Sequence, residues 1–410
     1  MKIVLLHYAA PPVVGGVESV IGHHARLMAD AGHEVSVIAG RGEQLDPRIP
    51  FLPLPLADSR HPEVLAVKAV LDRGEVPTEF QTLVEKLTGS LHRLTAGVDI
   101  LIAHNVYSLN KNLALTAAIK NLVEAKEGPR VILWHHDLAW TTPRYLPELH
   151  EGEPWDLLRT PLAGVTHVTV SEARQIELSD LLKLPPGKII VIPNGIDIHQ
   201  FHKLEETTQM LVRRLELFKA EPLILLPVRI TPRKNIEYAL NVVASICQTL
   251  PHTVLVVTGP LGPHNPENVK YFERLRTLRK KLGLESSAHF LAEVSDQVLP
   301  DSVIADFYHL SDLLLLPSRE EGFGIPLLEA GLAGIPIFCA DIPPLRTLGQ
   351  AQVTYFRLDS DPAKTAGTIA GRMEQDQSWK MRVRVRQEYT WEGIYDTLIA
   401  PLLRDQGGGS

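Results

Sequence analysis

Two glutamates, Glu321 and Glu329, are separated by seven residues that include a glycine-rich turn. An ionised carboxylate accepts two hydroxyl hydrogen bonds at once, so this pair suits a ligand with many hydroxyl groups. Gly322 and Gly324 precede a predicted helix, where backbone N–H groups can approach a ligand at the positive end of the helix dipole. The spacing favours a polyhydroxylated ligand, although an arbitrary pair of glutamates is more often a pair of solvated charges.

Three cations within six residues suggest a phosphate site. Arg229, Arg233 and Lys234 follow the apolar run 223–228, which predicts a buried strand. Arg229 could place its forked guanidinium on phosphate oxygens, and Lys234 could add a point charge near the start of the next helix. We expect Arg233 to be solvated. A basic surface turn without a ligand is the alternative for this string.

Histidines and glycines mark two further turns in the first half. His104 and the pair His135 and His136 stand at the ends of predicted strands, where a histidine is most often a hydrogen-bonded structural residue. Gly15 and Gly16 precede a predicted helix and could expose N–H groups to an anion, although a plain turn is the commoner reading. The glycines fit neither a dinucleotide fingerprint nor a P-loop.

These residues need a scaffold of strands that alternate with helices. Nearly every predicted strand is apolar throughout, which is typical of a parallel sheet covered on both faces, with ligands beyond the carboxyl ends of the strands. The expected strands are 2–7, 35–39, 98–103, 130–134, 168–170, 188–192, 223–228, 254–258, 289–291, 313–316 and 335–339.

A chain of 410 residues suggests about two domains. We expect a first domain over 1–198, a second over 199–385, and a closing helix over 386–404 that crosses back to the first. Residues 405–410 are expected to be a tail or a cloning remnant. We expect alternating arginines over 382–386 to form a solvated face.

Composition excludes several classes of function. The net charge of −7 argues against nucleic-acid binding and gives no attraction to anionic membranes, so a peripheral membrane contact is not indicated. Cys247 and Cys339 lie in apolar contexts and predict a reduced, cytoplasmic protein. No zinc spacing is present, and Asp359 and Asp361 are better explained by helix capping than by a metal, so we expect no metal site.

Five motifs in order resemble one family. The Gly15–Gly16 loop, His136 with Asp137, the Asn194–Asp197 turn, Arg229 with Lys234, and Glu321 with Glu329 resemble the family 4 retaining glycosyltransferases (glycosyl transferases group 1). The resemblance implies the GT-B fold, two Rossmann-like parallel-sheet α/β domains facing each other across a cleft. It also implies transfer of a hexose from a UDP-, GDP- or ADP-sugar to a sugar, small-molecule or glycan acceptor, without a further cofactor.

The resemblance also implies roles for individual residues. The implied catalytic set is His136 near the reacting carbon of the donor sugar, Arg229 and Lys234 on the departing diphosphate, and Glu321 on the transferred sugar; His135 stays open as the alternative to His136. The implied donor-binding set is Gly15, Gly16, Val294, Gly322, Phe323, Gly324, Ile325 and Glu329. Among these, the backbone near Val294 would read the base and Glu329 would bind the ribose.

Some alternatives stay open. A sugar-nucleotide epimerase or a glycan phosphorylase could share the two-domain plan, although no lysine is a clear candidate for the pyridoxal phosphate that a phosphorylase needs. A non-catalytic sensor of nucleotide sugars is a third reading. The irregular, aromatic-rich segment 138–166 could be an acceptor-side lid or a mere insertion. The sequence does not indicate the oligomeric state.

Overall fold

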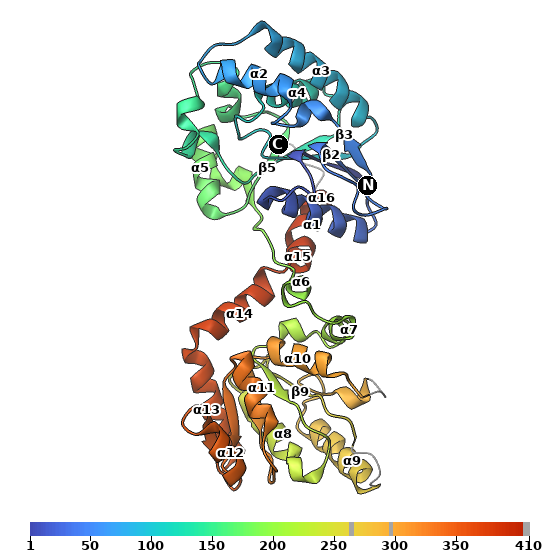
Figure 1. Ribbon diagram of the computed structural model, residues 1–410, viewed down its shortest axis with the longest axis vertical. Helices are drawn as coiled ribbons and strands as arrows, with labels where there is room; N and C mark the ends of the chain where they lie inside the picture. Colours follow the sequence, from blue (N-terminus) through green and yellow to red (C-terminus); the bar gives the residue numbers. More distant parts are fainter. Residues whose placement is uncertain (262–265, 295–297, 405–410) are drawn as a thin grey trace. The chain divides into compact units, whose positions relative to one another are not determined.

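The computed structural model describes residues 1–261, 266–294 and 298–404 (Figure 1). The predicted tail 405–410 lies outside these residues. The chain divides into two compact units, one formed by Met1–Gly195 with Trp391–Ser410 and the other by Ile196–Thr390. Each unit is described by itself below.

The first unit contains a seven-stranded parallel sheet in the order β3-β2-β1-β4-β5-β6-β7. Every residue of β1 after Lys2 is buried, as expected for a strand covered on both faces. The strands are β1 (Lys2–Ala9), β2 (Glu34–Arg41), β3 (Phe51–Pro53), β4 (Ile100–His104), β5 (Arg130–His135), β6 (Val165–Thr169) and β7 (Ile189–Val191).

Helices cover both faces of this sheet. Ile3 and Leu5 of β1 pack in the core with α1 (Gly16–Asp30) and the returning chain end, whereas Val4 and Leu6 point into the core under α2, α3 and α4. The remaining helices are α2 (Pro62–Leu71), α3 (Thr78–Leu94), α4 (Leu113–Glu124), α5 (Glu172–Leu182), α15 (Trp391–Ile394), the π-helical turn η9 (Tyr395–Ile399) and α16 (Ala400–Arg404). Short 3-10 turns cover Pro55–Ala57, Ala139–Thr141, Leu146–Glu148, Trp155–Arg159 and Pro186–Lys188.

The irregular segment 138–166 is partly built into this core. Trp155 and Leu158 are buried against the residues of α3 and α4. The Trp140 indole donates a hydrogen bond to the carbonyl of Trp155 at 3.3 Å, and Arg159 lies over the Trp140 ring at 4.0 Å. These contacts pack this part of the segment against the domain, and its role as an acceptor-side lid stays a prediction.

The second unit contains a six-stranded parallel sheet in the order β10-β9-β8-β11-β12-β13. Its strands are β8 (Leu223–Leu226), β9 (Val254–Val257), β10 (Ala288–Phe290), β11 (Leu313–Leu316), β12 (Ile337–Ala340) and β13 (Thr354–Phe356). Neither β13 nor β3 of the first unit is among the expected strands. Its helices and short turns are α6 (Ile198–His202), α7 (Glu206–Arg214), η6 (Leu217–Lys219), η7 (Pro232–Lys234), α8 (Ile236–Ile246), α9 (Pro266–Lys281), η8 (Leu291–Glu293), α10 (Asp301–Leu310), α11 (Ile325–Ala333), α12 (Pro343–Gly349), α13 (Pro362–Gln375) and α14 (Gln377–Glu388).

Both sheets have Rossmann topology, so the predicted pair of Rossmann-like parallel-sheet domains is confirmed. In each sheet the first three strands run outward in one direction, and the fourth strand returns to the other side of the first. The order reverses between β1 and β4 in the first unit and between β8 and β11 in the second. Ligands of open α/β sheets bind at this switch point, beyond the carboxyl ends of the strands.

One surface prediction was wrong. Arg386 on α14 is buried, not solvated, because it forms an ion pair with the buried Asp312 at 2.7 Å and donates to the carbonyls of Leu310 and Ala220. These contacts hold α14 against the segment that precedes β11. Arg386 lies on the buried face of α14. The alternating arginines in the sequence had suggested that all of them face solvent.

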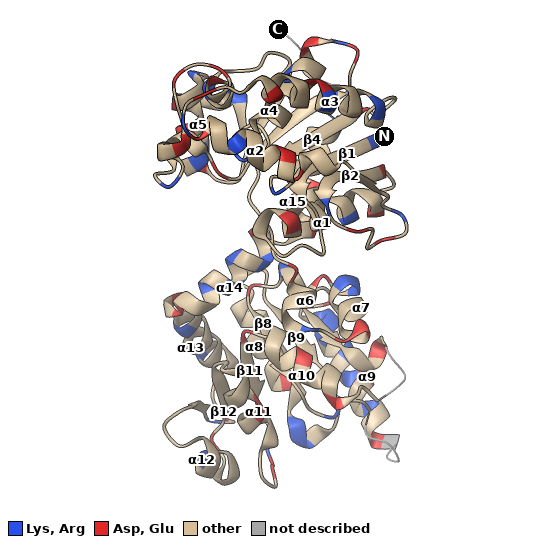
Figure 2. Cartoon of the chain, turned by 45° about the horizontal axis from the view of Figure 1, so that its top comes forward, with Lys and Arg blue, Asp and Glu red and all other residues tan. Residues whose placement is uncertain are grey.

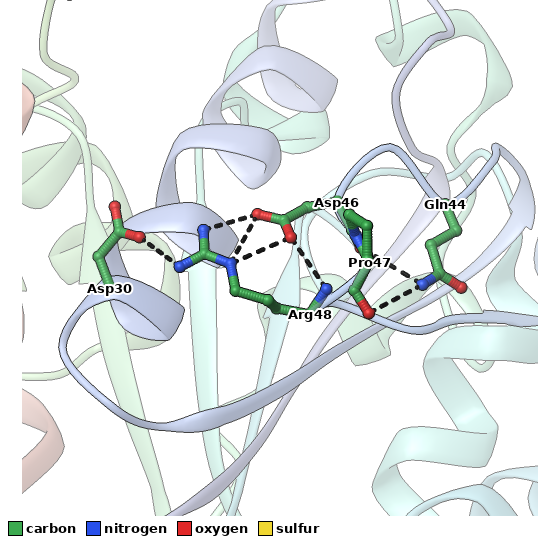
Figure 3. A network of polar contacts seen from close by, with 5 residues as sticks. All are labelled: Asp30, Gln44, Asp46, Pro47 and Arg48. Carbon is green, nitrogen blue, oxygen red and sulfur yellow. Dashed lines mark hydrogen bonds and ion pairs between the residues drawn. The ribbon is translucent and has the colours of Figure 1, made fainter.

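Positively and negatively charged residues are both scattered along the chain in each unit (Figure 2). One exposed cluster joins the loop after β2 to the end of α1 (Figure 3). In this cluster, Arg48 forms ion pairs with Asp30 and Asp46, each at 2.7 Å. Among the described residues, no helix is long and apolar enough to cross a bilayer.

Candidate active-site edges

The first cluster lies at the switch point of the first unit, where β1, β4 and β5 end. Asn105 follows β4 in the left-handed conformation with φ 57°, which asparagine tolerates better than most residues. Its side-chain oxygen accepts hydrogen bonds from the backbone N–H groups of His136 at 2.7 Å and Asp137 at 3.2 Å. Asn105 thereby ties the turn after β4 to the turn after β5 and fixes the backbone of His136.

Three histidine rings gather at this edge. His104 Nδ1 lies 3.1 Å from His136 Nε2. His7 Nδ1 donates to the carbonyl oxygen of His104 at 2.7 Å, and its Nε2 lies 4.0 Å from a carboxylate oxygen of Glu18. Burial lowers the pKa of His7 to about 3 and that of His136 to about 4, and it also lowers the pKa of His104. The rings are therefore neutral near pH 7.

The two adjacent histidines of β5 have different surroundings. His135 Nε2 lies 3.1 Å from His167 Nδ1, and its other nitrogen is buried without a hydrogen-bond partner among the residues that the structure describes. His136 Nε2 faces His104. Its Nδ1 has no hydrogen-bond partner among the described residues and, unlike Nδ1 of His135, is not fully buried. His136 is thus the better placed of the two to meet a ligand.

The glycine loop borders the same edge. Gly15 caps α1 in an extended conformation, and a Cβ atom there would lie 2.1 Å from a carboxylate oxygen of Glu18. Any larger residue would displace that carboxylate, which faces His7. A Cβ atom at Gly16 would meet no atom within 4 Å, so packing within the unit does not require glycine there.

The second cluster lies at the switch point of the second unit, in the loops after β8 and β11. Lys234 Nζ and Glu321 Oε1 form an ion pair at 2.5 Å, and their side chains are only 9% and 8% exposed. The Asn235 amide donates to the carbonyl of Pro317 at 3.1 Å, and the Arg319 N–H donates to the carbonyl of Arg233 at 2.8 Å. The two loops are therefore locked together around the ion pair.

The two neighbouring arginines are exposed. Arg229 has no ion pair or hydrogen bond with any residue that the structure describes, so its guanidinium is available to a ligand. Arg233 lies 3.9 Å from a carboxylate oxygen of Glu321 and donates to the carbonyl of Glu320 at 3.4 Å. Arg233 is half exposed, as expected, but it also helps to surround Glu321.

The glycine turn leads into α11. Gly324 has φ 107°, and a Cβ atom there would lie 2.6 Å from a Leu345 methyl group, so only glycine fits. Gly322 has open space around it. Phe323 and Ile325 are more than half exposed, and no side chain caps the start of α11. Pro326 has no N–H and the Leu327 N–H donates to the carbonyl of Gly324 at 3.0 Å, so among the first three residues of this helix Ile325 has the N–H group left for a ligand.

Glu329 lies further along α11 and accepts a hydrogen bond from a residue of the neighbouring helix α10. The Tyr308 hydroxyl on α10 donates a hydrogen bond to Glu329 Oε2 at 2.6 Å. Burial, together with this carboxylate, raises the pKa of Tyr308. No motif around Tyr308 could have singled it out from the sequence.

Val294 is separated from these residues. It follows η8, beyond β10, and β10 is two strands away from β8. Its N–H already donates to the carbonyl of Leu291 at 3.0 Å, so its carbonyl is the backbone group left for a ligand. No hydrogen bond or ion pair joins Val294 to Lys234 or Glu321 in the described part of the chain.

The described residues contain no group of three or more histidines, cysteines and carboxylates that could hold a metal ion. Asp361 accepts a hydrogen bond from the N–H of Ala363 at 2.9 Å at the start of α13. Its predicted role as a helix cap is confirmed. Cys247 and Cys339 are both free thiols.

Comparison with known sequences decides the family. The sequence model named Glycosyltransferase Family 4 matches residues 14–200, and the one named Glycosyl transferases group 1 matches residues 209–388. The chain belongs to the family 4 glycosyltransferases. The two matches follow one another, and each falls almost wholly within one structural unit.

Individual relatives are distant. A mannosylglucosylglycerate synthase from Petrotoga mobilis is 26% identical over 296 residues, which span 66% of this chain and 66% of that protein. A D-inositol 3-phosphate glycosyltransferase from Thermobispora bispora is 25% identical over 379 residues, 87% of this chain and 81% of that protein. The crystal structure of Anabaena Alr3699/HepE in complex with UDP and glucose aligns over 98% of this chain and 99% of that one, with 17% identity and a TM-score of 0.37.

Proposed function

We propose that this family 4 glycosyltransferase moves a hexose from a UDP-, GDP- or ADP-sugar to an acceptor hydroxyl, with retention of configuration and without a metal ion. The observation that carries the proposal is the edge of the second unit. There a buried ion pair, an available arginine and the uncapped start of α11 occupy neighbouring loops at the switch point. A sugar bound through a diphosphate needs this combination of cations, carboxylates and backbone donors.

Arg229 and Lys234 stabilise the departing diphosphate in this proposal. Arg229 is unpaired among the described residues and can donate two parallel hydrogen bonds to phosphate oxygens. Lys234 is held in place by Glu321, and its ammonium group has two further N–H donors. Donors fixed before the reaction stabilise the developing charge without reorganisation, so this step needs no divalent cation.

The carboxylates of the glycine turn bind hydroxyl groups. We assign Glu321 and the backbone of 322–325 to the transferred sugar, and Glu329 to the ribose. Glu321 shares one oxygen with Lys234 and keeps further acceptor capacity, while Tyr308 orients Glu329. Because both carboxylates are engaged in this way, we assign neither of them as a nucleophile. In a front-face reaction the leaving phosphate itself takes the acceptor proton.

His136 and the Gly15–Gly16 loop are the proposed donor contacts of the first unit. Burial lowers the pKa of His136 to about 4, so the ring acts on the sugar as a neutral hydrogen-bonding group and not as a cation. Val294 would contribute its carbonyl to the nucleotide base.

A donor screen tests the proposal. The protein is incubated with UDP-, GDP- and ADP-hexoses, with and without sugar and polyol acceptors, and nucleoside diphosphate release is measured with and without a chelator. We expect release with one class of donor, no effect of the chelator, and a product that keeps the anomeric configuration by NMR. Measurable donor binding without release would contradict transfer. A sugar epimerised in the same mixture would instead support the epimerase reading.

A further inference from the structure

The pair His104–His136 joins the ends of the neighbouring strands β4 and β5. His104 is the last residue of β4 and stands beside Trp134, with which it is in register; His136 follows β5 on the same face. The two rings stack with their centroids 5.4 Å apart, and His104 Nδ1 lies 3.1 Å from His136 Nε2. His104 is fully buried, so its position is set by the core.

A hydrogen bond between two neutral imidazoles can have only one donor, which leaves two arrangements. In the first, His104 Nδ1–H donates to His136 Nε2, and His136 carries its proton on Nδ1. In the second, His136 Nε2–H donates to His104, and His136 Nδ1 is a bare acceptor. Burial lowers the pKa of both rings, which keeps each of them singly protonated.

The buried side of His104 distinguishes the arrangements. His104 Nε2 has no hydrogen-bond partner within the described part of the chain. In the first arrangement this atom is an unpaired acceptor, whereas in the second it is an unpaired N–H group. Buried N–H groups without a partner are rarer than unpaired acceptors, so the first arrangement is favoured.

We propose that His104 is a positioning residue that holds His136 in the Nδ1–H tautomer, so that the ligand meets a hydrogen-bond donor at His136. The neighbouring groups complete the pattern. His7 gives its Nδ1 proton to a carbonyl oxygen, so its Nε2 is a lone-pair acceptor, and Glu18 adds a carboxylate 4.0 Å away. The edge thus offers one donor beside two acceptors, which suits adjacent hydroxyl groups of a sugar. The role of His136 toward a sugar rests on the proposed function; its tautomer does not.

The tautomer can be measured without any ligand. In a long-range 1H–15N spectrum of the histidine-labelled protein, a protonated nitrogen and a bare nitrogen have well-separated 15N shifts, and the His136→Gln variant identifies the His136 signals. We expect His136 to be protonated at Nδ1. A proton on Nε2 overturns the proposal, whatever the protein does with nucleotide sugars.

Two substitutions of His104 separate positioning from packing. His104→Asn keeps an amide donor close to the place of Nδ1, whereas His104→Leu removes it. We expect the Asn variant to keep the Nδ1–H signature of His136 and the Leu variant to lose it. For the donor identified by the screen, nucleoside diphosphate release should fall roughly tenfold in the Leu variant, mainly in kcat, and recover most of its rate in the Asn variant. Equal behaviour of the two variants in the spectrum would contradict the role of His104.

The pair His135–His167 provides a matched control. Its nitrogens are also 3.1 Å apart and its rings also stack, but both remaining nitrogens are sealed in the core. His167→Leu removes a buried histidine contact of the same length. It should lower the stability of the first unit without moving the His136 signals or the release rate. A change of the His136 tautomer in this control would show that the effect of His104→Leu is general loosening.

Discussion

In the second unit the candidate site residues carry full charges. Lys234 and Glu321 are buried as an ion pair, and Arg229 adds an unpaired guanidinium among the described residues. In the first unit the equivalent edge of the sheet carries His7, His104 and His136, which are neutral because they are buried. Both clusters nevertheless lie at the same topological position, the point where the strand order reverses.

The charged edge and the neutral edge suit different ligands. A diphosphate carries full negative charges that need cations, and a buried cation needs a carboxylate to hold it in the absence of ligand. A sugar carries neutral hydroxyl groups that need donors and acceptors of fixed direction, which imidazole rings supply without the cost of burying charge. The same sheet topology thus carries side chains suited to a diphosphate in one unit and to a sugar in the other.

The largest expected effect is the acid sensitivity of the first unit. Burial lowers the pKa values of His7 and His24 to about 3, and those of His136 and His167 to about 4. The unfolded chain binds protons at these rings below about pH 6.5, whereas the folded unit does not, so stability is present above that pH and is lost as the pH falls toward 4. Between pH 7.5 and 5.5 each ring should cost roughly 1–2 kcal/mol of folding stability, so the four together should cost roughly 5 kcal/mol.

Urea unfolding followed by tryptophan fluorescence checks this prediction. Four of the five tryptophans belong to the first unit, so the Trp379→Phe variant reports on that unit alone. His24 has no hydrogen-bond partner for either ring nitrogen among the described residues and packs against Trp134 and Trp391, so His24→Phe should reduce the pH dependence by about a quarter. A first unit equally stable at both pH values would show that the rings are not neutral by burial, and the contrast between the units would fail.

The next effect concerns the buried ion pair of the second unit. Lys234→Met should lower turnover by roughly a hundredfold, because it removes a fixed cation from the departing diphosphate. It should also cost about 3 kcal/mol of stability, because Glu321 is left buried without its partner. The double variant Lys234→Met with Glu321→Gln removes both charges and should recover stability but not turnover. Recovered turnover would mean that Lys234 serves only to neutralise Glu321.

Replacing Arg229 should lower turnover as much as replacing Lys234 does, but it should not lower stability. Its side chain is exposed and unpaired within the described residues, so Arg229→Ala should leave the urea midpoint unchanged while lowering turnover by roughly a hundredfold. Arg233→Ala tests the neighbouring cation, and Arg48→Ala, in the exposed cluster of Figure 3, tests the loss of a cation elsewhere. Equal losses of turnover in all three would mean that net charge, and not position, matters.

The sequence predicted the scaffold well because its signal is local. Apolar runs that alternate with helical segments specify buried parallel strands, and the fold followed from them. The short strands β3 and β13 were missed because three residues at the edge of a sheet carry little periodicity.

The sequence identified candidate site residues by their chemical type, but it did not predict which of them pair with one another. The pairing of Lys234 with Glu321 joins loops 87 residues apart, and that of His104 with His136 joins strands 32 apart, so no local pattern contains either. Arg386 shows the opposite failure: a local pattern of arginines suggested solvent, whereas the partner Asp312 lies 74 residues away. Assignments of the individual site residues to a donor sugar stay predictions.

The smallest effect tests whether the charged edge also reads a neutral ribose. Tyr308→Phe removes the hydroxyl that donates to Glu329 at 2.6 Å and leaves an exposed carboxylate free to rotate, so stability should hardly change. Binding of the preferred nucleoside diphosphate should weaken about fivefold, near 1 kcal/mol for one hydrogen bond, with little change in kcat. Calorimetry with the 2′,3′-dideoxy analogue is the decisive comparison, because a ligand without ribose hydroxyls should bind the variant and the unmodified protein equally. Equal weakening for both nucleotides would place Tyr308 and Glu329 outside the ribose site and leave the second unit with a purely ionic edge.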